Sequence, residues 1–196
     1  GPVKENYKTD LLNNDIAFEE GIHSEQKILS ADIVMKSPGI PESNELVKKI
    51  RSKEIEVISE IEFAYRYKGK SKIIAITGSN GKTTTTAMVH HLWRLAGEDC
   101  AMVGNIGFSF ARQVAEEPKS LYVVEVSSFQ LDDIKTFRPD VAVITNITED
   151  HLDRYGYDVN NYIKSKFRIT ENQTAQDVFI YNMDDETTMN YLKQHS

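Results

Sequence analysis

The feature that most constrains the fold of this chain is an apolar run that leads through a glycine turn into a polar helix start. Residues 73–76 are all apolar and predict a buried strand, Gly78 and Gly81 predict a tight turn, and the next helix begins at Lys82. Such a turn directs several backbone N–H groups at one point, and the helix dipole adds partial positive charge there. The run therefore predicts a strand-to-helix unit that holds a nucleotide polyphosphate.

The side chains of this turn suit the same ligand. Lys82 supplies a full positive charge and Thr83 a hydroxyl that suits Mg²⁺. The general phosphate-loop pattern has a glycine five residues before Gly81, where this chain has Ile76. The loop alone is compatible with kinases, GTPases, ATPases and ligases. We expect the nucleotide to contact Gly78, Ser79, Asn80, Gly81, Lys82, Thr83 and Thr84.

Composition excludes several other functions. A net charge of −7 argues against nonspecific binding to nucleic acid. No apolar run approaches the roughly 20 residues that span a bilayer, and the polar N-terminus does not resemble a signal peptide. Cys100 is the one cysteine, which fits a reducing cytosol and a small apolar role on a strand. We expect a cytoplasmic protein that neither inserts into membranes nor binds nucleic acid.

Strand and helix patterns alternate from residue 71 onward. Alternation of this kind predicts right-handed crossovers and a mainly parallel α/β sheet, with ligands at the carboxyl ends of its strands. Before that point we predict a helix, a strand, a helix and a strand at 6–14, 30–35, 41–53 and 54–59. After it we predict strands at 72–77, 100–103, 121–126, 141–146 and 177–182, and helices at 82–96, 106–116, 128–136 and 159–171.

Polar residues follow two of the predicted strands. Glu125 ends the strand at 121–126, where it could hold Mg²⁺ or face water. Ser127 and Gln130 come next, as hydrogen-bonding groups for a ligand or as a plain helix cap. The strand at 141–146 leads to Asp150 and His151, which could bind metal or orient a phosphate or carboxylate.

Together these motifs resemble the Mur ligase family, the ATP-dependent amide ligases of peptidoglycan synthesis. The loop at 77–85 is similar to the family's ATP loop, and residues 146–155 resemble its Asn-x-Thr-x-Asp-His-x-Asp segment. Residues 125–131 are similar to the segment of the family's D-glutamate-adding members. The resemblance implies that ATP phosphorylates the carboxylate of UDP-N-acetylmuramoyl-L-alanine. The amine of D-glutamate then attacks the acyl phosphate.

The resemblance also implies roles for particular residues. It implies one Mg²⁺ at Thr83 and Glu125 and a second near His151. The family carries a carbamylated lysine, which falls at Lys166, four residues after Tyr162. By spacing alone that helix is a solvated face, and Lys164 is an equal candidate. The implied catalytic residues are Lys82, His151 and Lys166, the implied metal ligands Thr83, Glu125, His151 and Lys166, and the implied substrate contacts Ser37, Pro38, Gly39, Asn105, Ser127 and Gln130.

The resemblance further predicts the organisation of the chain. Residues 1–66 are expected to form part of a Rossmann-like, UDP-binding N-terminal domain, and residues 67–196 part of a central ATP-binding domain. The glycine-rich turn that opens the family's first domain and its amino-acid-binding domain are not recognised here. We therefore expect a monomer that is inactive alone. Two alternatives are a sister ligase with another amino-acid substrate and a nucleotide-binding module without chemistry of its own.

Overall fold

The computed structural model describes residues 2–150 and 152–195, which fall into two compact units. The smaller unit comprises residues 1–34 and 42–57, and the larger comprises residues 35–41 and 58–196. The predicted domain boundary between residues 66 and 67 concerns functional domains and stays a prediction.

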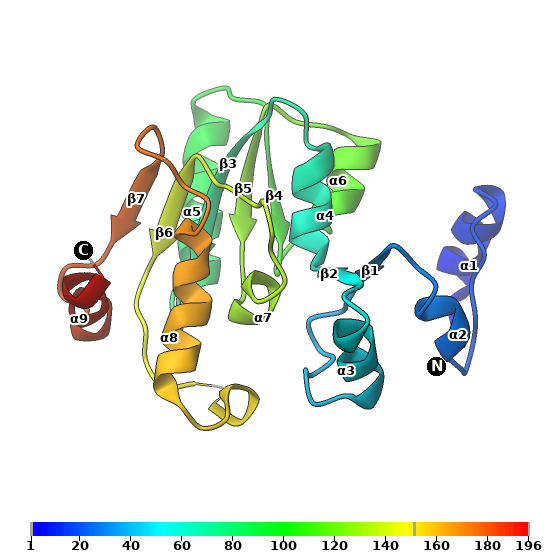
Figure 1. The fold of residues 1–196 in the computed structure, drawn as a ribbon. Helices are drawn as coiled ribbons and strands as arrows, with labels where there is room; N and C mark the ends of the chain where they lie inside the picture. The colour runs from blue at the N-terminus through cyan, green and yellow to red at the C-terminus, as the bar shows by residue number, and fades with distance from the viewer. Residues whose placement is uncertain (1, 151, 196) are drawn as a thin grey trace. The chain divides into compact units, whose positions relative to one another are not determined.

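The smaller unit contains short helices and two short strands (Figure 1). Its elements are α1 (Glu5–Asn13), α2 (Glu25–Ile28), β1 (Ile33–Met35), α3 (Glu45–Ser52) and β2 (Glu56–Ile58). β1 and β2 form a two-stranded sheet. The side chain of Asn44 caps α3 by accepting from the backbone N–H groups of Leu46 and Val47. The helix buries Val47 and Ile50, as its spacing predicts.

The larger unit is built on a five-stranded parallel sheet, which confirms the predicted fold class. The strand order is β4-β5-β3-β6-β7, and each neighbouring pair is parallel. Its elements are α4 (Glu60–Tyr67), β3 (Lys72–Thr77), α5 (Lys82–Leu95), β4 (Cys100–Gly104), α6 (Phe110–Glu116), β5 (Leu121–Glu125), α7 (Ser128–Leu131), β6 (Val141–Ile144), the 3₁₀ helix η1 (Leu152–Tyr155), α8 (Val159–Phe167), the 3₁₀ helix η2 (Arg168–Thr170), β7 (Val178–Tyr181) and α9 (Glu186–His195).

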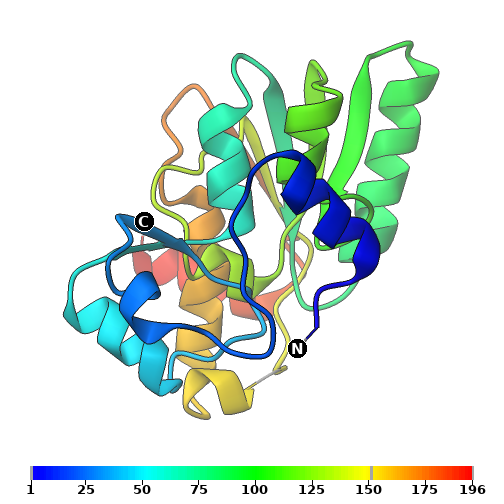
Figure 2. The same ribbon diagram turned by 90° about the vertical axis from the view of Figure 1, so that its right-hand side faces the viewer.

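Helices cover both faces of this sheet. Along β3, Ile73 and Ala75 belong to a large core with α4, α6 and α8, whereas Ile74 and Ile76 belong to a smaller cluster that Val89 of α5 covers. In Figure 2, α5 and α8 lie on opposite sides of the strands. After β3 the chain continues to β4 at one edge of the sheet, and after β6 it continues to β7 at the opposite edge. The crevice between the carboxyl ends of β3 and β6 is therefore the expected ligand position.

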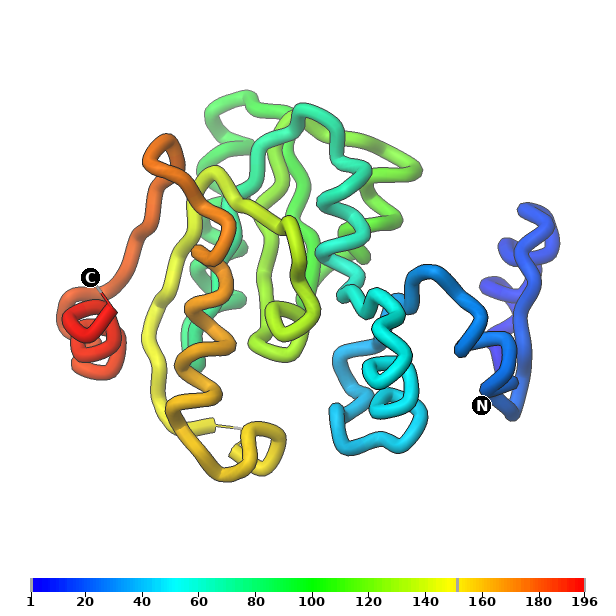
Figure 3. Tube along the Cα trace, viewed as in Figure 1, coloured from blue at the N-terminus to red at the C-terminus, as the bar shows by residue number. Residues whose placement is uncertain are grey.

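Several helices differ from the sequence-based expectation. The sequence predicted no helix for α2, α4, α9 or η1, it began α6 at residue 106 rather than at Phe110, and it extended α7 to residue 136. Figure 3 shows α7 as a short coil between β5 and β6. It ends early because the backbone N–H groups of Lys135, Thr136 and Phe137 donate to the buried carboxylate of Glu62 rather than to helical carbonyls.

Candidate active site

The glycine loop has the backbone geometry that its sequence predicts. Gly81 has a φ of 82° and is the N-cap of α5, which begins at Lys82. Gly78 has a φ of 150°, and a Cβ added there would lie 1.9 Å from the Oγ1 of Thr145. Only glycine can therefore bring the loop this close to the chain that follows β6.

Hydrogen bonds join the loop to that neighbouring segment. The Ser79 N–H donates to the carbonyl of Asn146 at 2.8 Å. The Asn80 N–H donates to Oδ1 of Asn146 at 3.0 Å, and Nδ2 of Asn146 donates back to the Asn80 carbonyl at 3.0 Å. The Thr145 hydroxyl donates to the same carbonyl at 2.7 Å. The structure thus brings the loop and the residues after β6 together, as the parallel sheet predicts.

Two lysine ammonium groups converge on one carbonyl of the loop. The Nζ of Lys82 donates to the carbonyl oxygens of Gly78 and Ser79, both at 2.9 Å. The Nζ of Lys166 reaches the Gly78 carbonyl from α8 at 2.8 Å, and it lies 4.5 Å from the ring centroid of Tyr162. The Lys82 ammonium meets neutral carbonyl oxygens in these contacts, so its positive charge favours an anion at this loop.

Burial separates Lys166 from Lys164, which the sequence left equivalent. Lys166 is 2 % exposed, whereas Lys164 on the same helix is exposed. Burial, and then the charge of Lys82, lower the pKa of Lys166 to about 7, although Asp150 and Asp132 act in the opposite direction. A substantial fraction of Lys166 is therefore an uncharged amine at neutral pH.

Glu125 sits at the end of β5 with its carboxylate held by two side chains. It is 2 % exposed. The Thr83 hydroxyl donates to Oε2 and the Asn105 amide donates to Oε1, each at 2.8 Å. The structure thus brings together three residues that the sequence analysis singled out, from the start of α5, the end of β4 and the end of β5.

The oxygens of this cluster fit Mg²⁺. A carboxylate and a hydroxyl are hard oxygen donors, which Mg²⁺ prefers, and it takes few protein ligands because phosphates and waters supply the rest. Within residues 2–150 and 152–195, no group of three or more His, Cys, Asp or Glu side chains could hold a metal. The adjoining Thr77 is buried, and its Oγ1 has no hydrogen-bond partner among the same residues. His151, the predicted second metal ligand, lies outside the described residues.

The predicted substrate contacts are arranged in three places. Ser127 and Gln130 form a capping box at α7, in which the Ser127 N–H donates to Oε1 of Gln130 at 3.0 Å and the Gln130 N–H donates to Oγ of Ser127 at 3.3 Å. The structure shows the capping interaction, and contact of these two residues with a ligand stays a prediction. Asn105 lies against Glu125, while residues 37–39 form part of a turn in the larger unit.

The sequence analysis did not assign the residues that hold the loop in place. Oγ of Ser79 donates to the Thr148 carbonyl at 2.9 Å and lies 3.1 Å from the hydroxyl of Tyr162. Thr148 and Tyr162 belong to the motifs that were singled out, but spacing along one segment does not show which loop it will contact. Thr84 is exposed on the first turn of α5.

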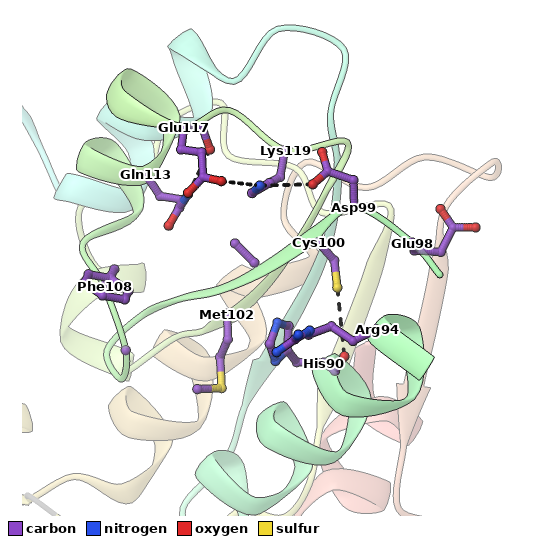
Figure 4. A pocket seen from close by; sticks show the side chains of 12 residues that line it. His90, Arg94, Glu98, Asp99, Cys100, Met102, Phe108, Gln113, Glu117 and Lys119 are labelled. Atoms are coloured by element: carbon purple, nitrogen blue, oxygen red, sulfur yellow. Dashed lines mark hydrogen bonds and ion pairs between the residues drawn. The ribbon is translucent and has the colours of Figure 1, made fainter. Parts of the chain in front are cut away.

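A separate cavity of about 460 Å³ lies beside β4, between α5 and α6 (Figure 4). Lys119 at its rim pairs with Asp99 at 3.0 Å and with Glu117 at 2.6 Å. Cys100 opens β4, as predicted, and burial raises the pKa of its thiol. Paired charges and a protonated thiol give this cavity no evident chemistry.

The larger unit therefore has the features of a phosphate-loop nucleotide-binding domain: a glycine turn, a lysine and oxygen donors at the carboxyl ends of parallel strands. The Mur ligase middle domain family matches residues 76–196, and the chain belongs to this family. Within the part of the chain that the structure describes, no helix is both long and apolar enough to cross a membrane.

Curated relatives make the comparison more specific. The chain is 55% identical over 194 residues to the UDP-N-acetylmuramoylalanine–D-glutamate ligase of Cytophaga hutchinsonii, and this match covers 98% of the chain and 43% of that protein. It is 53% identical over 193 residues to the protein of the same name from Bacteroides fragilis, with the same coverages. The chain thus spans less than half the length of these relatives.

Solved structures show the same fold at low sequence identity. A ligase from Neisseria meningitides, named UDP-N-acetylmuramate:L-alanyl-gamma-D-glutamyl-meso-diaminopimelate ligase, matches with a TM-score of 0.64 at 18% identity, over 99% of this chain and 65% of that one. A MurF ligase from Thermotoga maritima in complex with ADP matches with a TM-score of 0.55 at 16% identity, over 86% of this chain and 49% of that one.

Proposed function

We propose that this chain forms the nucleotide-handling part of an ATP-dependent ligase that joins D-glutamate to UDP-N-acetylmuramoyl-L-alanine. The observation that carries the proposal is the convergence of the Lys82 and Lys166 side chains on the Gly78 carbonyl. The names of the relatives at 53–55% identity support the choice of substrates.

The residues of the loop suit phosphoryl transfer. Lys82 and the backbone N–H groups at the start of α5 stabilise negative charge on the transferred phosphoryl group, which moves from ATP to the substrate carboxylate. The D-glutamate amine then attacks the carbonyl carbon, and phosphate leaves. Thr83 and Glu125, whose side chains meet at 2.8 Å, would hold Mg²⁺, and the ion would neutralise charge on the phosphates.

We propose that Lys166 acts as a carbamate at the site of a second Mg²⁺. His151, from the segment at residues 146–155, is the other ligand proposed for this ion. Its lowered pKa supports this role, because the uncharged amine is the form that adds to CO₂ and then loses a proton. The product exchanges a cation for an anion, which attracts Mg²⁺ where an ammonium would repel it.

The carbamate can be tested directly. ¹³C-labelled bicarbonate should give a carbamate signal in the NMR spectrum of the protein, and Lys166→Ala should remove that signal. In a full-length ligase carrying this sequence, Lys166→Ala should cut activity sharply, and acetate should partly restore it. An inactive Lys164→Ala beside an active Lys166→Ala would move the role to the exposed lysine.

We propose Ser37, Pro38, Gly39, Asn105, Ser127 and Gln130 as the contacts with the nucleotide sugar. The location of Asn105 at the Glu125 carboxylate supports this for one of them. Ser127 and Gln130 use the capping box to fix the chain directly after Glu125. We also propose a monomer and a location in the cytoplasm; the single cysteine, which cannot form a disulfide within the chain, supports the location.

Two measurements test the function as a whole. The 196-residue chain should bind ATP in the presence of Mg²⁺, as measured by calorimetry, but should not release phosphate when both substrates are added. A full-length protein carrying this sequence should release phosphate only with UDP-N-acetylmuramoyl-L-alanine and D-glutamate together. If the full-length protein releases phosphate with a different amino acid, a sister ligase is favoured. If the full-length protein binds ATP but releases no phosphate with any amino acid, a non-catalytic module is favoured.

A further inference from the structure

The turn at residues 37–40 is held through its carbonyl oxygens by two cationic side chains. Arg154 donates from one guanidinium nitrogen to the Pro38 carbonyl at 3.1 Å and from another to the Gly39 carbonyl at 3.4 Å. The Nζ of Lys36 donates to the Ile40 carbonyl at 3.0 Å. Three consecutive carbonyls of the turn thus accept from a cation.

Lys36 is anchored by a buried ion pair. Its Nζ lies 3.1 Å from Oδ2 of Asp133, and the two side chains are only 7 % and 1 % exposed. The backbone at both ends of this pair is also fixed, because the Lys36 N–H donates to the Ile58 carbonyl at 3.0 Å and the Ser59 N–H donates to the Asp133 carbonyl at 2.9 Å. Asp133 lies two residues after Leu131, the last residue of α7.

Arg154 is anchored to α7. Its guanidinium carbon lies 4.6 Å from the ring centroid of Phe129 in α7. That ring is stacked on Tyr155, with centroids 5.9 Å apart and planes at 8°. A guanidinium over an aromatic face gains cation–π attraction and keeps its N–H groups free for carbonyls in its own plane.

The buried pair of Lys36 and Asp133 is not the arrangement that would give the highest stability. A buried ion pair costs desolvation energy that an apolar pair of similar volume does not. Such a pair is instead suited to fixing one geometry, and here it fixes a turn of which three residues are proposed substrate contacts. Phe129 lies in α7 and Asp133 lies two residues after it, and α7 itself begins three residues after Glu125.

We propose that Lys36 and Arg154 are positioning residues, which hold the turn at 37–40 in the conformation that receives the nucleotide sugar. Through Asp133 and Phe129, they set the distance between this turn and the chain that carries Glu125. The proposal rests on the proposed function for the identity of the ligand, but the holding of the turn itself does not.

Hydrogen exchange on this chain tests the holding of the turn. The Ile40 N–H donates to the Ser37 carbonyl at 3.0 Å and closes the turn, so its exchange rate reports whether the turn opens. Arg154→Ala and Lys36→Met should each raise that rate at least about tenfold, and Arg154→Lys should rescue it only in part, because one ammonium cannot span two carbonyls. Arg138→Ala is the matched control, since it removes a guanidinium that pairs with Asp177, away from the turn.

Kinetics on a full-length ligase carrying this sequence tests the consequence. Arg154→Ala should raise KM for the nucleotide sugar at least about tenfold and leave KM for ATP within about twofold, and Arg138→Ala should change neither. Unchanged exchange at Ile40 in both variants would overturn the proposal, as would faster exchange with an unchanged KM for the nucleotide sugar. If the wild-type enzyme does not turn over the nucleotide sugar, the proposed function fails, and the exchange experiment alone then decides whether the two cations hold the turn.

Discussion

Two regions of the larger unit bury charged side chains, and the regions differ in how many partners surround each charge. At the junction of α4 with residues 133–137, the Glu62 carboxylate is fully buried and accepts from the N–H groups of Lys135, Thr136 and Phe137, from the Thr136 hydroxyl and from Arg66. At the glycine loop, the Glu125 carboxylate is also buried, and within residues 2–150 and 152–195 it accepts from two side chains, those of Thr83 and Asn105.

The buried lysines show the same contrast. Lys36 at the junction faces the carboxylate of Asp133, whereas Lys82 and Lys166 at the loop share the neutral carbonyl of Gly78. Charges satisfied from within the chain build structure, and charges left short of counter-charge mark a place where a ligand completes the balance. The difference predicts that substitutions at the junction will cost stability and that substitutions at the loop will cost binding and rate.

The largest expected effect is on stability at the junction. Glu62→Ala leaves three backbone N–H groups without the buried carboxylate that accepts from them, and we expect a loss of about 3–5 kcal/mol in the free energy of unfolding. Urea denaturation followed by circular dichroism measures this loss. Glu116→Ala, which breaks an exposed pair with Arg112, is the matched control and should cost less than about 1 kcal/mol.

The same carboxylate should also control stability in acid. Burial acts to raise the pKa of Glu62, but the donors around it hold that pKa below its ordinary value. Its contribution is therefore complete above the pKa of the unfolded chain and disappears as the pH falls through the lower pKa of the folded protein. Wild type should lose stability more steeply than Glu62→Gln below about pH 4.5, and equal slopes would contradict the comparison.

The next effect is on rate at the loop. In a full-length ligase carrying this sequence, Lys82→Met should remove a transition-state contact of about 3 kcal/mol, which is a hundredfold or more in rate. The free energy of unfolding should hardly change, because Lys82 pairs with carbonyls of its own loop. Lys119→Met, which breaks a bridge to Asp99 and Glu117, should leave the rate unaltered. Near-normal turnover of the Lys82 variant would make the loop a structural turn.

The strands of the larger sheet could be predicted from the sequence because each is a short apolar run with polar or glycine residues at its ends. All five were located to within two residues of their observed bounds. The loop, Glu125 and the segment after β6 could also be predicted to converge, since parallel strands place their carboxyl ends at one edge.

The remaining features depend on partners far along the chain. Lys166 has no distinction from Lys164 until α8 packs against the sheet and one face of the helix is buried. The early end of α7 depends on Glu62, and the burial of Lys36 depends on Asp133. No local pattern encodes these pairs, so reasoning from periodicity and spacing could not find them.

A pair of glycines tests how closely the loop must approach its neighbour. Gly78→Ala should weaken Mg²⁺–ATP binding more than Gly81→Ala, because the added Cβ would overlap Oγ1 of Thr145, whose hydroxyl is fixed by the Asn80 carbonyl. We expect an overpacking cost of about 1–3 kcal/mol in addition to backbone strain. At Gly81 no atom lies within 4 Å of the new Cβ, so only the strain of the left-handed conformation remains, about 1–2 kcal/mol. Calorimetry on the 196-residue chain measures both, and equal affinities would show that the loop moves freely.

The smallest effect concerns the pH dependence that Lys166 gives to stability. Its pKa is about 7 in the folded protein and near 10.5 when unfolded, so between these values the unfolded chain binds more protons. Stability should therefore rise with pH across this window, by at most about 1.4 kcal/mol per pH unit for one group.

Lys166→Met removes this contribution, so the unfolding free energy of wild type should increase relative to that of the variant from pH 7 to pH 9. Lys164→Met is the control on the same helix and should run parallel to wild type, because that side chain is exposed. The measurement needs CO₂-free buffer, since a carbamate on Lys166 would replace the titrating amine. Parallel curves for wild type and Lys166→Met would mean that the lysine keeps an ordinary pKa, and the contrast between the two regions would then rest on the carboxylates alone.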